Sequence, residues 1–380
     1  MADLQEALER LRLVESASTP VLSVYLELAP ELTEKRSIGA RIRDLLDPIG
    51  KLAASGDLDR RSSKSLRCGV QRAIGMAPDL TTELGRGVAL FICDELGLDE
   101  QLTMPRRIWD CAIAGPRPYL RPLQAAIDSY RRVASVVIDG RGAEIVVSHM
   151  AAEVERQAIE AEELRKSDVA GWHGLEEYRH RHHAEEVRNH LFREVAARLD
   201  RLRRDTGVDL VLVGGQVEVT QALLPFLDER VREMTDTFVA DLHTLTPAVL
   251  AATVSELEQA HRQREEIRHV DETYATAAAG GLATIGVNGV LKAAHHRAVS
   301  LLLIDHGAWR DGMVCSDCGA LALPAPACPQ CGGETEVVPD VLEALSRSVI
   351  DAGGVVEHVD GSRQLTDDLV AARLRFVSWA

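Results

Sequence analysis

The chain has 380 residues, of which 46% are hydrophobic and 27% are charged, and its formal net charge is −16. The hydrophobic fraction is sufficient for packed cores, which excludes an intrinsically disordered chain. The negative net charge excludes a protein that coats nucleic acid nonspecifically. Any RNA binding must therefore come from local basic patches and from a complementary shape of the two surfaces.

Neither a membrane span nor a secretion signal is visible in the sequence. No run of about eighteen apolar residues occurs, and the charged N-terminus MADLQEALERLRLVE lacks the apolar region of a signal peptide. We therefore expect a cytoplasmic protein. The length is typical of two or three domains, and we predict three, over residues 1–120, 121–268 and 269–380.

The first segment, residues 1–120, has the pattern of an α/β domain. Leucines recur at helical spacing near the N-terminus, VLSVYLEL alternates as a strand does, and GVALFIC is an apolar run typical of a buried strand. The predicted elements are a helix over 4–11, a strand over 21–28, a helix over 35–52, a polar link over 55–64, and strands over 87–93 and 107–114. No cofactor motif occurs in this segment.

The second segment follows a boundary marked by Pro116, Pro118 and Pro122. The tight turn Asp139–Gly142 lies between two short apolar runs and predicts a hairpin. The predicted elements are a linking helix over 123–131, strands over 136–138, 144–147, 208–215 and 237–240, and helices over 220–233 and 243–267. A hairpin followed by alternating helices and strands predicts a mixed sheet with helices on its faces.

The functional prediction is centred on one stretch of this segment, from Lys166 to Arg204. Residues 166–174 contain two glycines and no apolar period, which predicts a loop, and helical spacing begins near Leu175. Leucine and valine recur at i, i+4 and i+8, at Leu191, Val195 and Leu199, and predict one buried face. The other face carries Arg188, Arg193, Arg198, Arg201, Arg203 and Arg204.

The tip of this stretch has the residue types that bind folded RNA. Arginine binds phosphate, and Trp, Tyr and His stack on splayed bases. We therefore predict RNA contacts by Gly171, Trp172, His173, Gly174, Tyr178, Arg179, His180, Arg181, His182 and His183. The same pattern fits an ordinary surface loop before an amphipathic helix with solvated histidines, and composition alone does not separate the two.

The third segment, residues 269–380, is predicted to be a small α/β/α sandwich. Its central strand is the apolar run VSLLLID. The predicted elements are helices over 290–294 and 341–352, and strands over 299–305, 353–359 and 372–377. The pattern is interrupted after Arg310, which predicts an inserted minidomain over residues 311–337.

The insertion contains four clustered cysteines, Cys315, Cys318, Cys328 and Cys331, as two CxxC pairs separated by nine residues. Two such knuckles supply four thiolates for a tetrahedral zinc ion at Zn–S distances of about 2.3 Å. A quartet without a histidine or a fifth ligand predicts a closed, structural site. Two disulfides, which the cytoplasm disfavours, and an iron–sulfur cluster, which more often has other spacing, are the alternatives.

Glycines follow both cysteine pairs, at Gly319 and Gly332. They allow the backbone to turn tightly, and we expect them to donate their amides to the sulfurs. Because an insertion of this size cannot bury a core of its own, we also expect the metal to stabilise it.

Gly214, Gly215 and Gln216 spell Gly-Gly-Gln, which is catalytic in protein release factors, where it occupies the tip of a mobile loop. Here the tripeptide directly follows VDLVLV. That position predicts the end of a buried strand before a helix, where the turn needs small residues. We therefore interpret the tripeptide as structural rather than catalytic.

The order of the parts resembles the bacterial branch of the superfamily of archaeal and eukaryotic class-one release factors and their paralogue Pelota. In residues 121–268 the hairpin VVIDGRGAEIVV, the loop, the arginine-rich helix, the strand DLVLVGG and the charged helix follow in that family's order. In residues 269–380, GVLKAAHHRAVSLLLID is similar to the helix and strand of the kink-turn RNA-binding ribosomal-protein fold. A zinc ribbon inserted after LLLID is a feature of some members.

The first segment lacks the family's stop-codon-reading motifs, Asn-Ile-Lys-Ser among them. In this alignment the loop that carries Gly-Gly-Gln in the family is 166–174, which contains Gly171 but no glutamine in the catalytic place. Its Gly-Trp is most similar to the Balon-like hibernation factors and their mycobacterial relatives. Such factors occupy the A site of idle ribosomes under stress and are delivered with elongation factor Tu.

What the resemblance implies is a ribosome-binding protein without peptide release, and we assign no catalytic residue. The middle segment would reach the peptidyl-transferase centre, the first would face the decoding centre, and the third would lie on the factor-binding side. Two other functions stay open. A peptidyl-tRNA hydrolase or rescue factor would position water with another loop residue such as His173. A nuclease is disfavoured, because no carboxylate cluster for metal catalysis is evident.

Overall fold

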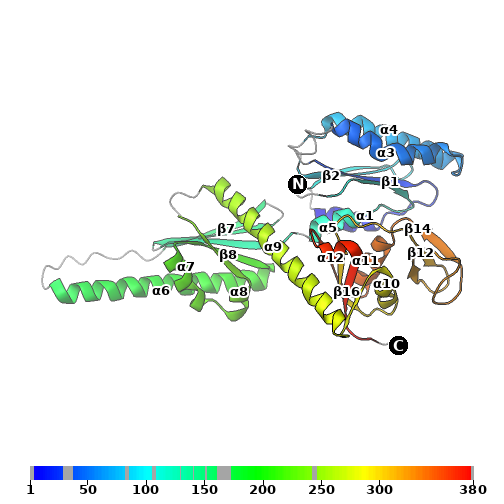
Figure 1. Ribbon diagram of the computed structural model, residues 1–380. Coiled ribbons are helices and arrows are strands. Elements are labelled where there is room, and N and C mark those ends of the chain that lie inside the picture. The colour runs from blue at the N-terminus through cyan, green and yellow to red at the C-terminus, as the bar shows by residue number, and fades with distance from the viewer. Residues whose placement is uncertain are drawn as a thin grey trace. The chain divides into compact units, whose positions relative to one another are not determined.

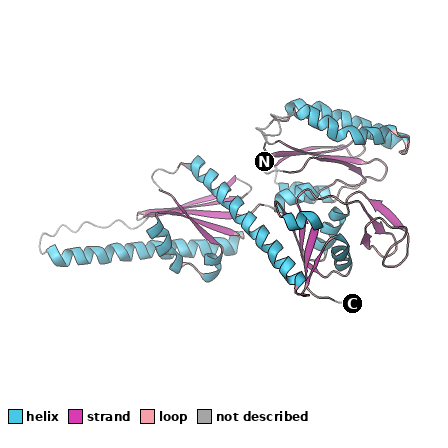
Figure 2. Cartoon of the chain, viewed as in Figure 1, coloured by secondary structure: helices cyan, strands magenta, loops and turns pink. Residues whose placement is uncertain are grey.

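The computed structural model describes residues 4–28, 37–81, 85–104, 108–128, 130–139, 141–149, 152–160, 173–241 and 246–377, and only the backbone of residues 128, 152 and 173–184. The chain forms two compact units. The first unit comprises Met1–Ser129 and Gln263–Ala380, and the second comprises Tyr130–Arg262. Both are built of helices packed on sheets (Figures 1 and 2). No helix in the described ranges is long and apolar enough to cross a membrane.

The N-terminal part of the first unit is an antiparallel sheet of order β3-β2-β1-β4 with two helices on one face. Ile42, Leu46 and Leu66 of these helices pack against alternate residues of the two central strands. The elements are α1 (Leu4–Arg12), β1 (Val21–Glu27), α3 (Ile38–Ala54), α4 (Arg60–Met76), η1 (Ala77–Asp79), β2 (Gly87–Cys93), β3 (Leu98–Met104), β4 (Cys111–Gly115) and α5 (Arg121–Asp128). The α/β class expected for this segment is confirmed.

The polar link expected over 55–64 is wrong from Arg60 onward, because α4 begins there. Asp59 caps this helix by accepting hydrogen bonds from the amides of Arg61 and Ser62. The sequence of α4 hides the helix, since its buried residues include Ser62 and Gly69, which add no apolar signal. Strand β3 is absent from the expected elements for a similar reason: its sequence LDEQLTM is mostly exposed or half-buried.

The C-terminal part of the first unit is a sheet of order β10-β16-β11-β15, in which β11 runs parallel to β15 and antiparallel to β16. Leu302 and Ile304 face helices α10 and α11, whereas Leu303 faces Val270 and Leu365 of α9 and α12. The α/β/α sandwich is therefore confirmed. Its elements are β10 (Ala283–Ile285), α10 (Val287–His295), β11 (Val299–Asp305), α11 (Val341–Asp351), β15 (Val355–Val359), α12 (Arg363–Asp368) and β16 (Val370–Leu374).

A buried ion pair joins the N-terminal and C-terminal parts of the first unit. Arg121 Nε donates to Asp340 Oδ2 at 2.9 Å, and the two side chains are 0% and 1% exposed. The Tyr119 hydroxyl donates to the same carboxylate at 2.8 Å, and Arg121 Nη2 donates to the carbonyl of Ala308. Buried charges are tolerated when paired and hydrogen-bonded in this way. The three-domain division stays a prediction, since a unit built from two segments can hold two domains.

The second unit contains a five-stranded sheet of order β7-β6-β5-β8-β9, antiparallel on the β7 side and parallel from β5 to β9. The mixed sheet expected from the sequence is confirmed. Its elements are β5 (Val133–Ile138), β6 (Gly142–His149), β7 (Ala152–Glu160), α6 (His173–Thr206), β8 (Leu210–Gly215), α7 (Val217–Leu223), η3 (Leu224–Phe226), α8 (Glu229–Glu233) and β9 (Thr235–Val239), followed by α9 (Pro247–Ala278), which continues into the first unit.

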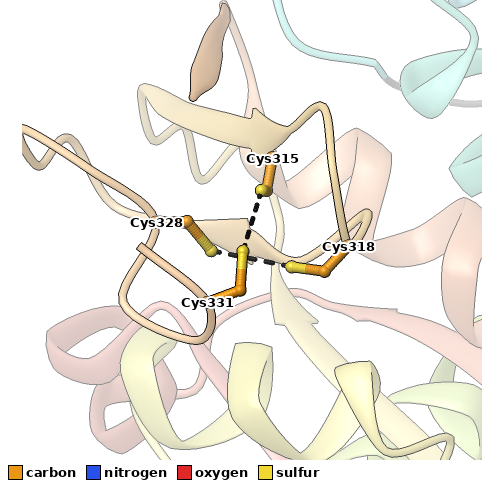
Figure 3. A group of neighbouring side chains, drawn as sticks. All are labelled: Cys315, Cys318, Cys328 and Cys331. Carbon is orange, nitrogen blue, oxygen red and sulfur yellow. Dashed lines mark hydrogen bonds between the residues drawn. The ribbon is translucent and has the colours of Figure 1, made fainter. Parts of the chain in front are cut away.

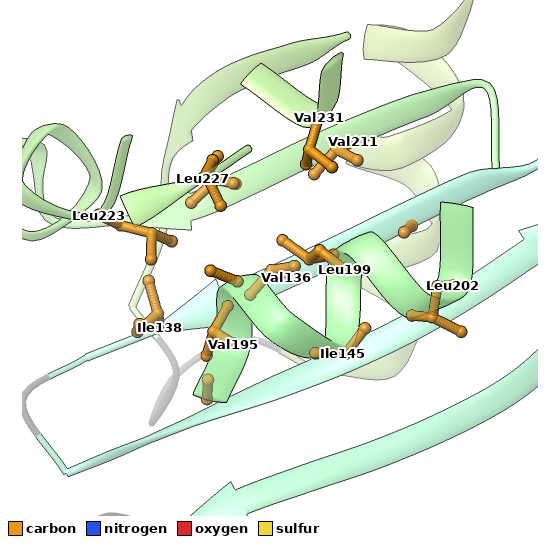
Figure 4. Packing of buried hydrophobic residues seen from close by; sticks show 14 of the residues in the cluster. Val136, Ile138, Ile145, Val195, Leu199, Leu202, Val211, Leu223, Leu227 and Val231 are labelled. Carbon is orange, nitrogen blue, oxygen red and sulfur yellow. The ribbon is translucent and has the colours of Figure 1, made fainter. Parts of the chain in front are cut away.

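Helix α6 covers one face of this sheet. Val195 and Leu199 pack in one cluster with Val136, Ile145 and other strand residues (Figure 4). Leu250 and Val254 of α9 pack against the opposite face. The sheet therefore has helices on both faces, as expected.

Two details of the second unit differ from the expected elements. The helix expected over 220–233 is divided into α7, η3 and α8, because Pro225 has no backbone N–H to continue the helix and Asp228 caps a new one. The expected hairpin has a third strand, β7, paired with β6. Its side chains are largely exposed or half-buried, so it carries little apolar alternation.

The packing of α6 predicts which of its residues stabilise the unit. Leu199→Ala should lower the free energy of unfolding by about 2–5 kcal/mol, because Leu199 is 1% exposed and its loss leaves a cavity. Arg201→Ala, two residues away on the exposed face, should change it by no more than about 0.5 kcal/mol. Hydrogen exchange of the β5 and β8 amides measures both, and equal effects would contradict the packing.

Candidate functional site

The arginine-rich helix α6 begins at His173, two residues before the expected start near Leu175. Its predicted buried face is confirmed, since Leu191, Val195 and Leu199 are at most 2% exposed. Phe192 and Leu202 extend the same face. These residues all lie in the C-terminal half of the helix.

The N-terminal half of α6 extends beyond this hydrophobic cluster. Among the α6 side chains that the structure describes, the cluster takes none before Leu191, and those at 185–190 are exposed or half-buried. Residues 173–190 amount to about 27 Å of helix at 1.5 Å per residue. Figure 1 shows α6 continuing past the end of the strands. The second unit thus presents a long helical projection anchored at one end.

The arginines of α6 fall into two groups. Arg198, Arg203 and Arg204 form ion pairs with acidic residues of the same helix: Arg198 pairs with Glu194 at 3.0 Å, and the other two share Asp200 at 3.1 and 2.8 Å. Two of these three positive charges are thus offset. Arg188, Arg193 and Arg201 are exposed, and within the described part of the chain no carboxylate pairs with them. Arg188 lies over the Phe192 ring, 6.0 Å from its centroid.

The acidic partners of these arginines were not foreseen from the sequence. Spacing alone could have revealed Glu194 with Arg198 and Asp200 with Arg204, since i and i+4 are neighbours on a helix. Gln157, which accepts from Arg198 at 2.8 Å, could not have been found because strand β7 was not expected. The basic patch available for RNA is therefore smaller than the six arginines indicated.

None of the ten predicted RNA-contact residues lies in the part of the chain whose side chains the structure describes. Residues 166–172, including Gly171 and Trp172, lie outside the described residues. His173 and Gly174 open α6, and Tyr178, Arg179, His180, Arg181, His182 and His183 follow on its projecting backbone. The side chains of 173–184 also lie outside the described part, so these contacts stay a prediction.

The Gly-Gly-Gln tripeptide occupies the end of a buried strand, as expected. Gly214 and Gly215 close β8, and a Cβ on Gly214 would lie 2.4 Å from the Phe238 ring. A Cβ on Gly215 would lie 2.5 Å from the carbonyl oxygen of Ile138. Gln216 is the N-cap residue of α7, but its exposed side chain makes no capping hydrogen bond. The two glycines are thus required by packing, whereas the Gln216 side chain is exposed and makes no capping hydrogen bond.

The four cysteines of the insertion lie together at one end of a small antiparallel sheet. That sheet has the order β13-β12-β14, formed by β12 (Gly312–Cys315), β13 (Leu321–Ala322) and β14 (Thr335–Val338). The four sulfurs lie within 4.8 Å of one another and point toward a common centre (Figure 3). Cys315 and Cys328 are buried, at 2% and 4% exposed.

The sulfur separations fit a tetrahedral metal ion. Cys315 Sγ lies 3.5 Å from Cys331 Sγ, and Cys318 Sγ lies 3.7 Å from Cys328 Sγ. Four sulfurs at about 2.3 Å from a central zinc ion would be about 3.8 Å apart. A disulfide needs about 2.0 Å, so both pairs are too long for one. The quartet can therefore hold a metal ion.

The backbone around the quartet differs from the expectation in one respect. The amides of Gly319 and Gly332 donate to the carbonyl oxygens of Cys315 and Cys328 at 3.0 and 2.8 Å, not to sulfurs. Both glycines have positive φ, at 71° and 75°, so they do form the tight turns. Gln330 donates its amide to Cys328 Sγ at 3.4 Å.

The pKa values of the cysteine thiols differ within the quartet. Amides of Cys331 and Gln330 lower the pKa of the Cys328 thiol to about 6. The Gly333 amide also lowers the pKa of Cys331, but the neighbouring sulfurs of Cys318 and Cys315 together outweigh it and raise that pKa to about 12. A cation at the centre would displace the remaining protons, because metals bind thiolates.

A comparison with family models identifies one match. Residues 118–265 match the bacterial archaeo-eukaryotic release factor family 10. The matched range begins just before α5 and includes β5 to β9 and helices α6 to α8. Over these residues the match confirms the resemblance to archaeo-eukaryotic release factors that the order of the elements predicts.

Several solved structures are similar at low identity. The archaeal translation termination factor aRF1 is 19% identical, over 98% of this chain and 97% of that chain, with a TM-score of 0.26. A ribosome-bound archaeal Pelota, from a structure that also contains ABCE1, is 18% identical over 74% and 72%, with a TM-score of 0.42. Thermoplasma acidophilum Pelota is 12% identical over 77% and 80%, with a TM-score of 0.25. No curated protein matches the chain.

The position of the Gly-Gly-Gln tripeptide predicts that the fold tolerates a substitution of Gln216 and is destabilised by a substitution of Gly214. Gln216→Ala should leave the free energy of unfolding within about 0.5 kcal/mol, because the side chain is exposed and makes no capping bond. Gly214→Ala should lower it by about 1–3 kcal/mol, because the added methyl overlaps Phe238. Hydrogen exchange of β8 measures both variants. A stable Gly214→Ala protein with a damaged Gln216→Ala protein would reverse the interpretation.

Proposed function

We propose that this protein is a ribosome-associated translation factor of release-factor type, which occupies the A site of idle ribosomes without releasing peptide. The family match over residues 118–265 supports an origin among release factors. The Gly-Trp sequence of the loop at 171–172 supports the narrower likeness to Balon-like hibernation factors. Elongation factor Tu would then be the delivery partner, and the cytoplasm the location.

The observation that carries the proposal is the projection of α6. A helix anchored by Leu191, Val195 and Leu199 carries its first residues about 27 Å beyond the core. Such a rod can enter a narrow RNA-walled channel while the sheet stays outside. The backbone of residues 178–183 lies on this projection, and their Tyr, Arg and His side chains have the chemistry of RNA contacts. Exposed Arg188 and Arg193 lie nearby for phosphates.

The stretch 166–174, for which the sequence predicts a loop, lacks the group that peptide release requires. Release needs a residue that places water on the ester carbonyl, with donors for the developing oxyanion. The loop 166–174 has no glutamine, and Gln216 belongs to the start of α7. Trp172 has no proton-accepting atom and suits stacking on a base. We therefore propose that the loop is an inert plug of the peptidyl-transferase centre.

One residue, His173, supports a second candidate function, that of a hydrolase. His173 follows Trp172 and begins α6, and a histidine can act as a base near neutral pH. A peptidyl-tRNA hydrolase or rescue factor would use it in place of the missing glutamine. The two functions predict different results on ribosomes that carry peptidyl-tRNA.

We further propose that the metal of the cysteine quartet is zinc. Four sulfurs near tetrahedral separations and no histidine match a closed structural site. Zinc held by Cys315, Cys318, Cys328 and Cys331 would join the two cysteine turns beside the β12-β13-β14 sheet. Its contribution is to the folding of residues 311–337.

Elemental analysis tests the zinc proposal. Purified protein should contain about one zinc ion per chain, and Cys315→Ser should lower that content and increase hydrogen exchange of β12 and β14. Cys68→Ser is the matched control, because Cys68 is a half-buried cysteine of α4 outside the quartet. Protein that contains no metal but protects the β12 and β14 amides from exchange would contradict the zinc proposal.

Sedimentation tests ribosome association. The protein should pellet with intact ribosomes and bind generic duplex RNA only weakly, because its net charge is −16. Arg193→Gln and Arg201→Gln should each weaken ribosome binding. Each should also reduce the slope of log affinity against log salt concentration by about 1. Arg198→Gln should have a smaller effect, because Glu194 already neutralises Arg198. Equal affinity for ribosomes and random RNA would favour a nuclease.

Ribosomes loaded with peptidyl-tRNA separate the plug from the hydrolase. The wild-type protein should bind them and release no peptide above background. Trp172→Ala should weaken binding about tenfold or more, because one base stack contributes about 1–3 kcal/mol. His173→Ala should leave peptide release at background. Rapid release by the wild type that disappears in His173→Ala would establish the hydrolase instead.

A further inference from the structure

Helix α4 of the first unit carries only positive charge in an acidic chain. The chain has 59 Asp and Glu against 43 Lys and Arg, but the 17 residues of α4 include five Lys or Arg and no Asp or Glu. The proposed use of α6 leaves α4 without a role, because α6 belongs to the second unit. The concentration of charge on α4 therefore has a cause of its own.

The packing of α4 turns part of this charge straight into solvent. Its buried residues recur at i, i+4, i+7 and i+11 and lie against the sheet: Ser62, Leu66, Gly69 and Ala73. Four exposed residues recur at the same spacing on the opposite side of the helix: Arg60, Lys64, Arg67 and Gln71. We call these four residues the outer stripe. Figure 1 shows α4 with α3 on one face of the β1-β2 sheet.

The other two cations of α4 lie on its flank and are already paired. Arg61 pairs with Glu95 at 3.3 Å, and Arg72 pairs with Asp94 at 2.8 Å. Both carboxylates belong to the turn between β2 and β3. Among the described residues, no carboxylate pairs with the cations of the outer stripe. The charge of the stripe is therefore available to a partner.

The cations of α4 stand where they weaken the helix. Arg60 and Lys64 are neighbours at i and i+4, and Lys64 and Arg67 are neighbours at i and i+3, so these like charges repel. Arg60 and Arg61 also lie in the first turn, which contains no acidic residue, and the positive end of the helix dipole repels cations there. The stability of α4 does not explain this arrangement, whereas an anion bound to the stripe would remove the repulsion.

The residue types of the stripe favour RNA as the anion. A membrane-surface helix buries an apolar face in lipid, and a protein interface is centred on apolar and aromatic side chains. The outer stripe has neither, because the apolar residues of α4 pack on the sheet. Arg, Lys and Gln are the side chains that contact phosphate and sugar oxygens. Arg60 and Arg67 lie about 10 Å apart along the helix, so the stripe can contact more than one phosphate.

We propose that the outer stripe of α4 is a second RNA-binding surface, on which Arg60, Lys64 and Arg67 bind phosphates of ribosomal RNA. This inference rests on the proposed ribosome association and adds a contact of the first unit to that of α6. Gln71 continues the stripe by one turn and donates its amide to a phosphate or a ribose. The sheet holds α4 before binding, so the backbone loses little entropy when the RNA binds.

The first test removes the charge of the stripe from the full chain. The triple variant Arg60→Gln, Lys64→Gln, Arg67→Gln should lower ribosome affinity roughly tenfold or more, and should reduce the slope of log affinity against log salt concentration by about 2–3. It should fold at least as stably as the wild type, because it removes like-charge neighbours. Lys64→Arg keeps the charge and should bind ribosomes as the wild type does. Sedimentation at several salt concentrations measures these variants.

A matched control removes three exposed arginines of the same unit that already have acidic partners. Arg117 pairs with Glu15, Arg268 with Glu265, and Arg347 with Glu343. Their joint substitution by Gln makes the same change in net charge as the triple variant. It should leave ribosome affinity within about twofold and the salt slope within about 1, because paired cations release few counterions.

A second measurement keeps all of the charges of the stripe. A benzophenone amino acid at position 71 should cross-link the protein to ribosomal RNA when it is irradiated on ribosomes. Cross-links to ribosomal proteins alone would overturn the inference, and so would equal losses of affinity in the triple variant and its control. Wild-type binding that the triple variant leaves unchanged would overturn the inference and keep the proposed function. A wild-type protein that does not pellet with ribosomes would overturn both.

Discussion

The second unit depends on one contact, the packing of the C-terminal half of α6 against the mixed sheet. Val195, Leu199 and Leu202 lie in the same hydrophobic cluster as Val136, Ile145 and Val211 (Figure 4). Isolated helices are marginal in water because nucleation is costly. The packed half supplies a nucleus from which the helix continues back to His173. The same contact therefore stabilises the unit and forms the projection that the proposed function uses.

An acidic protein can bind a polyanion only where charge and shape are locally favourable. The structure limits the available charge on α6, since Glu194 and Asp200 pair with three of its arginines and offset two of their three charges. Exposed Arg188, Arg193 and Arg201 remain along the described part of the helix. Binding that depends on a few arginines and a projecting helix would be specific for a shaped RNA site, because generic phosphate contacts are too few to retain duplex RNA.

Apolar periodicity predicted the elements whose burial is strong and regular. Strands such as VSLLLID and GVALFIC match β11 and β2 in their bounds, and the spacing of Leu191, Val195 and Leu199 located the buried face of α6. Helix α4 and strands β3 and β7 were not predicted, because their buried positions are few or small. The cysteine spacing predicted the sulfur cluster. The buried ion pair of Arg121 with Asp340 could not be predicted, because its residues lie far apart in the sequence and meet only in the folded unit.

The central claim is that the start of α6 enters the peptidyl-transferase centre and leaves the ester bond of peptidyl-tRNA intact. A cryo-EM map of ribosomes from starved cells, or of ribosomes incubated with the protein, tests it most directly. The account predicts density for this chain in the A site, with residues 171–183 against large-subunit RNA, in the absence of peptide release. Density that places α6 away from that centre, or no density in the A site of ribosomes that co-sediment with the protein, would contradict it.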